Sequence, residues 1–164
     1  MYTTPMRILG IDPGIGRTGW GIIEDSSSKL QAVSFGCFET MPNSPTPQRL
    51  VLIYNHLQHL IDEYRPEALG IEDLFFNRNV STALTVGQSR GVVMLAAEQA
   101  GLPIGIYTPL QVKMAVTGYG RAEKKQIGEM VKLLLKLKSI PKPDDTADAL
   151  AIAITHAFSR KSIR

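Results

Sequence analysis

The sequence predicts an α/β protein, in which a five-stranded mixed β-sheet is covered by helices on both faces. Two observations favour this class. Short apolar runs bounded by turn residues, which are typical of strands, recur between residues 6 and 107. Longer segments whose apolar residues recur every three or four positions lie between the later strands and after the last one. Alternation of this kind indicates a sheet with helices packed on its faces.

The first three predicted strands follow one another without an intervening helix. The five strands cover residues 6–11, 19–23, 32–38, 68–71 and 104–107. Segments 13–16 and 25–28 contain the Pro, Gly, Asp and Ser residues of turns. Short strands joined by such turns predict that the first three strands are antiparallel neighbours.

Five segments have helical character. They cover residues 46–64, 79–100, 109–116, 122–137 and 144–158. Thr46 followed by Pro47 predicts the N-cap and first position of the first helix, and Gly101 predicts a C-cap after the second. The second helix has one stripe formed by Leu84, Gln88, Gly91, Val92 and Leu95.

The length of 164 residues suits a single domain with a substantial core. We expect residues 1–164 to form that domain, with a disordered tail from about residue 159. No run of about 18 apolar residues occurs, so we expect no membrane span. The single Cys37 cannot form an internal disulfide, which fits a cytoplasmic location. No Cys/His cluster has the spacing of a zinc site.

The net charge of +3 and the isoelectric point of about 9.1 permit nucleic-acid binding without requiring it. Basic residues concentrate in one region, where only Glu123 and Glu129 oppose them. They are Lys113, Arg121, Lys124, Lys125, Lys132, Lys136 and Lys138. Taken alone, such a run is more typical of a solvated helix face than of a binding site.

Four carboxylates stand at positions that favour a common site. Asp12 ends the first predicted strand and Glu72 ends the fourth. Asp145 and Asp148 lie near the start of the last helix, three residues apart and therefore on one face. Because strand ends at one edge of a sheet commonly form sites, we expect the four side chains to converge there.

Carboxylates gathered in this way repel one another unless a cation lies among them. Hard oxygen ligands select Mg²⁺ or Mn²⁺, and four acids suffice for two ions about 4 Å apart, the arrangement that hydrolyses phosphodiesters. Structural alternatives remain open for single residues: Asp12 as a turn residue, and Asp144 or Asp145 as an N-cap. Asp148 is harder to explain in this way, because it opens the apolar run 149–154.

Several stretches spread over nearly the whole chain carry a resemblance to a known family. They are GIDPGIGRTGWG at 10–21, IEDLF at 71–75, QSRG at 88–91, QVK at 111–113, AEK at 122–124 and DTADALAIAITH at 145–156. In this order they resemble the RuvC-type Holliday-junction resolvases of the RNase H-like superfamily. The resemblance implies an RNase H-like fold and a homodimer that cuts four-way DNA junctions with Mg²⁺ by paired nicks of like polarity. It also implies a partnership with the RuvA–RuvB branch-migration complex.

The resemblance also implies roles for particular residues. The metal-binding catalytic set would be Asp12, Glu72, Asp145 and Asp148, holding two Mg²⁺ ions per subunit, with Mn²⁺ able to substitute. Some members of the family have His at the third of these positions. The residues implied to contact DNA are Phe75, which would stack at the opened junction centre, and Lys113 and Lys124, which would bind phosphate. We add Arg121 and Lys125 from the same basic region.

Three other functions fit parts of the sequence. The glycine-rich turn at 13–19 resembles that of actin-like ATP-dependent phosphotransferases, although the chain is too short for their two lobes. A non-catalytic junction-binding module would be expected to lack one of the acids, and all four are present. A nuclease of the same fold that acts on other branched DNA or on RNA–DNA hybrids remains open, because fold alone does not set the substrate.

Overall fold

The computed structural model describes residues 4–27, 29–73 and 80–161, which contain one five-stranded sheet. The strands are β1 (Met6–Asp12), β2 (Arg17–Ser26), β3 (Lys29–Glu39), β4 (Ala68–Glu72) and β5 (Ile104–Tyr107). Their order across the sheet is β3-β2-β1-β4-β5. β2 is antiparallel to both β1 and β3, whereas β1, β4 and β5 are parallel. The predicted five-stranded mixed sheet with three antiparallel strands at its start is confirmed.

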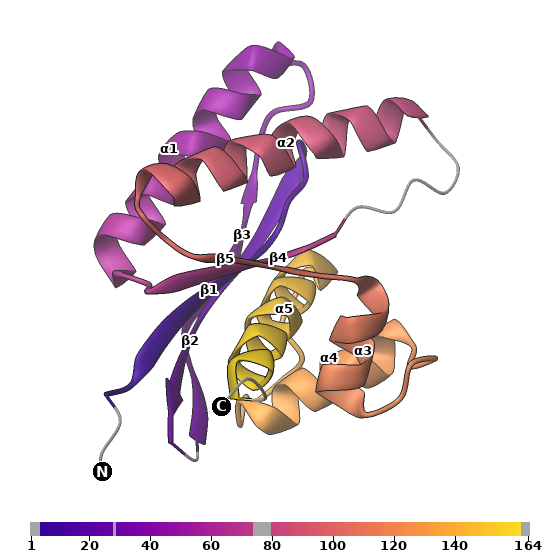
Figure 1. The fold of residues 1–164 in the computed structure, drawn as a ribbon. Helices are drawn as coiled ribbons and strands as arrows, with labels where there is room; N and C mark the ends of the chain where they lie inside the picture. Colours follow the sequence, from indigo (N-terminus) through magenta and orange to yellow (C-terminus); the bar gives the residue numbers. More distant parts are fainter. Residues whose placement is uncertain (1–3, 28, 74–79, 162–164) are drawn as a thin grey trace.

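Helices cover both faces of the sheet, as predicted (Figure 1). They are α1 (Thr46–Tyr64), α2 (Val80–Gln99), α3 (Pro109–Thr117), α4 (Lys124–Leu134) and α5 (Asp144–Lys161). One core lies between the sheet and the pair α1 and α2, and a second lies between the sheet and α3, α4 and α5. Within the described ranges, no helix is long and apolar enough to cross a bilayer.

Helix α5 packs against a row of glycines that crosses the sheet. Gly21, Gly10, Gly70 and Gly105 are in register on β2, β1, β4 and β5. A Cβ atom placed on Gly10 would lie 2.1 Å from the carbonyl oxygen of Ala149 in α5. The glycines therefore allow the helix backbone to approach the sheet more closely than any side chain would permit. Residues 149–154 of α5 are all buried as a result.

Several predicted boundaries differ from the observed ones. β2 and β3 extend beyond residues 19–23 and 32–38, because their polar ends continue the antiparallel pairing past a register shift at Ile22 and Ile23. The N-cap of α1 is Pro45, so the prediction of Thr46 as the cap is wrong by one residue. Helix α4 begins at Lys124 and ends at Leu134, inside the predicted range of 122–137.

The end of α5 also differs from the prediction. The helix continues to Lys161, so residues 159–161 are helical where a disordered tail was expected. The extra turn is anchored by two ion pairs to Asp25, a buried residue near the end of β2. Its carboxylate lies 2.7 Å from Nζ of Lys161 and 3.3 Å from a guanidinium nitrogen of Arg160. These contacts link residues far apart in the chain and have no local sequence signature.

Helix α2 buries a different face from the one its large apolar residues suggest. The residues buried against α1 and the sheet are Ser89, Val93, Ala96 and Ala97. In the predicted stripe, by contrast, Leu84 and Leu95 are 63% and 52% exposed, and Gly91 has no neighbour near its Cβ position. Small residues and Val93 therefore pack α2 onto the molecule, with Val92 partly buried beside them, whereas Leu84 and Leu95 face outward.

Candidate active site

The predicted acidic residues lie at one edge of the sheet. Asp12 and Glu72 are the last residues of the neighbouring parallel strands β1 and β4, whose register pairs Ile11 with Ile71. The start of α5 reaches the same edge, because a Cβ atom on Gly19, the β2 partner of Asp12, would lie 1.9 Å from the carbonyl oxygen of Asp145.

Asp12 has the most perturbed carboxyl group at this edge. Its pKa is raised from 3.8 to about 8, mainly by burial and then by the carboxylates of Asp148, Asp145 and Glu72, in that order. The cation of Lys124 acts in the opposite direction. Mutual repulsion of this kind requires that the acids lie near one another, and it makes the site favourable for a bound cation.

Glu72 and Asp148 are perturbed in the same direction. Burial is the main cause of the raised pKa of each, and the carboxylate of Asp148 adds to the effect on Glu72. Lys124 partly offsets the shift of Asp148, since its Nζ lies 3.4 Å from Oδ2 of that residue. The Asp148 carboxylate in turn raises the pKa of Lys124, which therefore stays protonated beside the acids.

The two adjacent aspartates at the start of α5 face different neighbours. Asp145 lies 3.9 Å from a guanidinium nitrogen of Arg17 and contributes to the raised pKa of Asp12. Asp144 lies 3.4 Å from Nζ of Lys142, on the side of the helix that faces α4. Of the two, Asp145 is thus the one directed toward Asp12.

A groove of about 550 Å³ brings acidic and basic residues together. Its wall includes Glu72 and Asp148 from the acidic set. The same wall includes three of the cations predicted to contact DNA, which are Lys113, Arg121 and Lys124. Carboxylates and cations along one groove form a surface that can bind a phosphodiester next to groups able to support its hydrolysis.

Two helix caps fix the basic side of this groove. At the start of α3, the Thr108 hydroxyl accepts from the backbone N–H of Gln111, whose side-chain oxygen accepts from the Thr108 N–H. At the start of α4, the side-chain oxygen of Gln126 accepts from the N–H of Glu123, 2.7 Å away. The caps set where Lys113 and Lys124 emerge, and the Thr108–Gln111 pair matches a capping-box signature that sequence reasoning overlooked.

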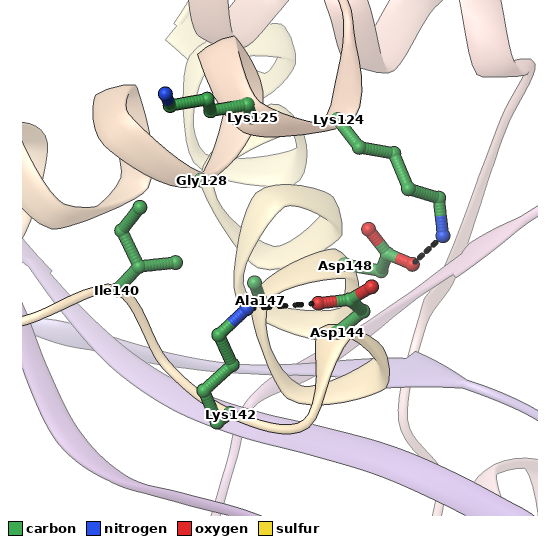
Figure 2. Close-up of a pocket in the computed structure, with 8 residues that line it drawn as sticks. All are labelled: Lys124, Lys125, Gly128, Ile140, Lys142, Asp144, Ala147 and Asp148. Atoms are coloured by element: carbon green, nitrogen blue, oxygen red, sulfur yellow. Dashed lines mark hydrogen bonds and ion pairs between the residues drawn. The ribbon is translucent and has the colours of Figure 1, made fainter.

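Two of the residues predicted to contact DNA are not among those that the structure places in this groove. Lys125 does not line this groove; it lines a neighbouring cavity between α4 and α5 (Figure 2). Phe75 lies outside the described residues, so the prediction of base stacking there stays a prediction.

The donor chemistry of the site suits a hard divalent cation, because carboxylate oxygens are the ligands such ions prefer. The side chains are not arranged as a finished metal site, however. Within residues 4–27, 29–73 and 80–161, no three acidic, His or Cys side chains are grouped closely enough to hold an ion. Asp148 is paired with Lys124, and Asp145 faces Arg17. The acids therefore lie close enough to raise the pKa of Asp12, but their side chains are not positioned to share one ion.

Sequence reasoning missed the role of Arg90. The sequence places it only within the QSRG stretch of the family resemblance. Its Nε instead donates to the carbonyl oxygen of Glu72, 3.4 Å away, and its guanidinium lies 3.6 Å from the Asp73 carboxylate. Arg90 thus holds the end of β4, where Glu72 stands, from the neighbouring helix α2. The acidic end of a strand followed by a lone arginine in the next helix is a weak signal for such a contact.

The sheet has three antiparallel strands, β1, β2 and β3, and is extended by the parallel strands β4 and β5. With acids at the edge shared by β1 and β4, this arrangement defines an RNase H-like α/β protein. The family model for crossover junction endodeoxyribonuclease RuvC matches residues 8–156. The chain belongs to this family, and its members are nucleases.

Relatives and solved structures match this chain over almost its whole length. The chain is 59% identical over 158 residues to the crossover junction endodeoxyribonuclease RuvC of Brevibacillus brevis, covering 96% of this chain and 95% of the relative. It is 56% identical over 154 residues to that of Desulfitobacterium hafniense, with coverages of 94% and 93%. The T. thermophilus RuvC in complex with Holliday junction substrate has 39% identity and a TM-score of 0.92, with 96% of each chain covered.

Proposed function

We propose that this protein resolves four-way DNA junctions by hydrolysing one phosphodiester bond in each of two strands of like polarity. The observation that carries the proposal is the groove in which Glu72 and Asp148 face Lys113, Arg121 and Lys124. Family membership and the likeness to a RuvC structure with a Holliday junction support the choice of substrate.

The acidic set has the role of holding divalent cations. Asp12, Glu72, Asp145 and Asp148 would bind two Mg²⁺ ions, for which Mn²⁺ can substitute. When bound, such ions activate water and stabilise the leaving 3′-oxygen. Burial and mutual repulsion favour this role, since a cation relieves the repulsion that raises the pKa of Asp12. We take Asp145 rather than Asp144 as the third ligand, because Asp145 is the one that acts on Asp12.

The basic residues of the groove hold the DNA strand. Lys113 and Arg121 line it beside Glu72, and each can bind a backbone phosphate. Lys124, whose Nζ lies 3.4 Å from Oδ2 of Asp148, would contact the phosphate under attack and stabilise the negative charge that develops on it. Phe75 keeps its proposed part as the aromatic residue that stacks on bases at the junction centre.

A homodimer would present two such sites to a junction with two-fold symmetry. The exposed stripe of α2 supplies a suitable contact, because Leu84 and Leu95 face solvent on either side of the small Gly91. We propose that the partner on this face is a second copy of the chain. A functional link to the RuvA–RuvB complex is part of the proposal through family membership alone. The DNA substrate and the free Cys37 fit a cytoplasmic location.

The decisive test is cleavage of a synthetic four-way junction in Mg²⁺. Products are mapped on each strand in turn, with linear duplex and an RNA–DNA hybrid of the same sequence as controls. We expect symmetric nicks in two opposite strands of the junction and little cleavage of either control. Preferential cleavage of the hybrid would replace the proposal with a ribonuclease function, and binding without nicking in Mg²⁺ or Mn²⁺ would leave only a binding module.

A further inference from the structure

A second cavity adjoins the candidate active site, and the function proposed above uses only the two residues that the cavity shares with the groove. It lies between α4 and the start of α5 and has a volume of about 230 Å³ (Figure 2). Lys124 and Asp148 line both this cavity and the groove, so the two hollows meet at that ion pair. A strand that runs along the groove past Asp148 therefore continues toward the cavity.

The cavity carries an excess of positive charge. The ammonium groups of Lys124, Lys125 and Lys142 line it, against the carboxylates of Asp144 and Asp148. The two acids are one helical turn apart on α5. As Figure 2 shows, Lys124 approaches Asp148 from α4, and Lys142 approaches Asp144 from the segment that precedes α5. The third ammonium, that of Lys125, has no acid beside it in this view. Three cations against two acids favour an anionic ligand.

The segment that carries Lys142 is fixed against α4 by close packing. A Cβ atom placed on Gly128 of α4 would lie 2.9 Å from Cγ2 of Ile140, so the glycine allows Ile140 to pack directly on the helix. Ile140 and Gly128 line the cavity on the side away from the acids. The Lys142 side chain itself is 75% exposed, and its only described partner is an exposed carboxylate. Such a pair holds its lysine weakly and can be exchanged for a phosphate.

We propose that this cavity is a second subsite for the DNA backbone, in which Lys142, with Lys125, binds a phosphate of the strand adjoining the cleaved bond. The inference rests on the proposed function for the identity of the ligand, a phosphodiester chain. Lys142 contacts phosphate only and contributes no base specificity. Its place before α5 extends the basic surface beyond the region between Lys113 and Lys138.

The salt dependence of binding tests this role. Binding of a labelled four-way junction is measured by fluorescence anisotropy in EDTA, where no cleavage occurs, over a series of salt concentrations. Each phosphate contact contributes about 0.9 to the slope of log K against log salt. Lys142→Gln should therefore weaken binding at low salt and make the slope shallower by about one. Lys142→Arg should retain the wild-type slope, because it keeps the charge.

Two companion variants keep the proposal falsifiable. Lys29→Gln removes the same charge from the first residue of β3, which pairs with the end of β2 remote from Asp12, and should leave affinity and slope unchanged. Asp144→Asn removes the carboxylate that competes for Lys142, so affinity should hold or rise. The proposal is wrong if Lys142→Gln keeps the wild-type slope. It is also wrong if Lys142→Gln and Asp144→Asn weaken binding equally, since the pair would then only hold the segment in place.

The outcome is separable from that of the proposed function. Nicking by the wild type in Mg²⁺ tests the proposed function, whereas the salt slopes of the variants test the subsite. A wild type that binds junctions without nicking them would end the first proposal and leave the slope comparison fully informative. A wild type that does not bind DNA would end both.

Discussion

The ammonium group of Lys124 lies 3.4 Å from Oδ2 of Asp148, joining a residue expected to bind DNA to one expected to be catalytic. Lys124 is the first residue of α4, and Asp148 lies in the second turn of α5. The contact brings the basic region and the acidic edge of the sheet into a single site.

Removal of the Lys124 cation should impair nicking more than binding. Lys124→Gln leaves Asp148 without the charge that lowers its pKa, and it removes a cation beside the attacked phosphate. We expect nicking to slow by about 100-fold, as for the loss of one donor that stabilises a transition state. The salt slope for junction binding should fall by about one. Single-turnover nicking by Lys124→Gln and by the remote variant Lys29→Gln is compared with that of wild type. Equal rates for the three proteins would show that Lys124 has no role in the reaction.

Neutral replacement of the acids should abolish nicking and leave junction binding intact or tighter. Asp12→Asn, Glu72→Gln and Asp148→Asn each remove a proposed cation ligand and one negative charge that repels DNA. The loss of rate should exceed the roughly 10–100-fold typical of residues that only support a metal ligand. Asp62→Asn, an exposed change on α1, is the matched control and should nick normally. An acid variant that cuts at the wild-type rate has no catalytic role.

The stability of the metal-free protein should decrease as the pH rises toward 8. Folding raises the pKa of Asp12 from 3.8 to about 8, so the folded protein holds this proton more tightly than the unfolded chain. The resulting stability is fully present below pH 3.8 and is lost as the pH rises through 8. The raised pKa values of Glu72 and Asp148 act in the same direction.

Urea denaturation in EDTA at several pH values measures this effect. The urea concentration at the denaturation midpoint of wild type should decrease as the pH is raised from 4 to 8. That of Asp12→Asn should decrease less. Addition of Mg²⁺ at pH 8 should raise the wild-type midpoint, because a cation stabilises the ionised carboxylates. If both proteins show the same pH dependence, Asp12 is not the perturbed group.

The close approach of α5 to the sheet should make its glycines intolerant of even one methyl group. In Gly10→Ala the new Cβ would lie 2.1 Å from a backbone oxygen of α5, so the helix must move. Overpacking of this kind typically costs about 1–3 kcal/mol in the free energy of unfolding. Gly16→Ala is the control, since its Cβ would meet only a side-chain nitrogen of Arg49 at 3.6 Å. Chemical denaturation should separate the two variants, and equal stability would show that α5 can shift freely.

The exposed stripe of α2 should hold two chains together. Leu84→Glu or Leu95→Glu places a charge in the proposed interface and should convert a dimer of twice 18.0 kDa into a monomer. Leu133→Glu changes a residue of similar exposure on α4 and should leave the dimer intact. Sedimentation equilibrium distinguishes these outcomes. A wild type that is monomeric throughout the accessible concentration range would rule out the interface.

The periodicity of the sequence was sufficient to predict the sheet and most of the helices. Apolar runs identified all five strands, and the positions of Asp12 and Glu72 after two of them predicted a shared edge. Those inferences succeeded because they depend on local pattern and on the geometry of parallel strands. Boundaries were less certain, since pairing across β2 and β3 continues through polar residues that carry no hydrophobic signal.

Features that depend on contacts between distant residues were not predictable. The bond from Arg90 to the Glu72 carbonyl depends on how α2 crosses the end of β4. The buried face of α2 consists of Ser89, Val93, Ala96 and Ala97, whereas the usual amphipathic pattern would place the larger Leu84 and Leu95 in the core. Lys142 lies outside the obvious basic run, and the packing of Ile140 on Gly128 places its segment beside α4.

Because α5 is the last element of the chain, the edge that it forms with the sheet over the row of glycines is completed last during synthesis. β1 leaves the ribosome early with Asp12, whereas Asp145 and Asp148 emerge only with α5, after every strand has been made. Until that helix arrives, four strands expose bare backbone and apolar side chains on one face. A chain that ends before α5 therefore lacks Asp145 and Asp148, two of the four acids at this edge.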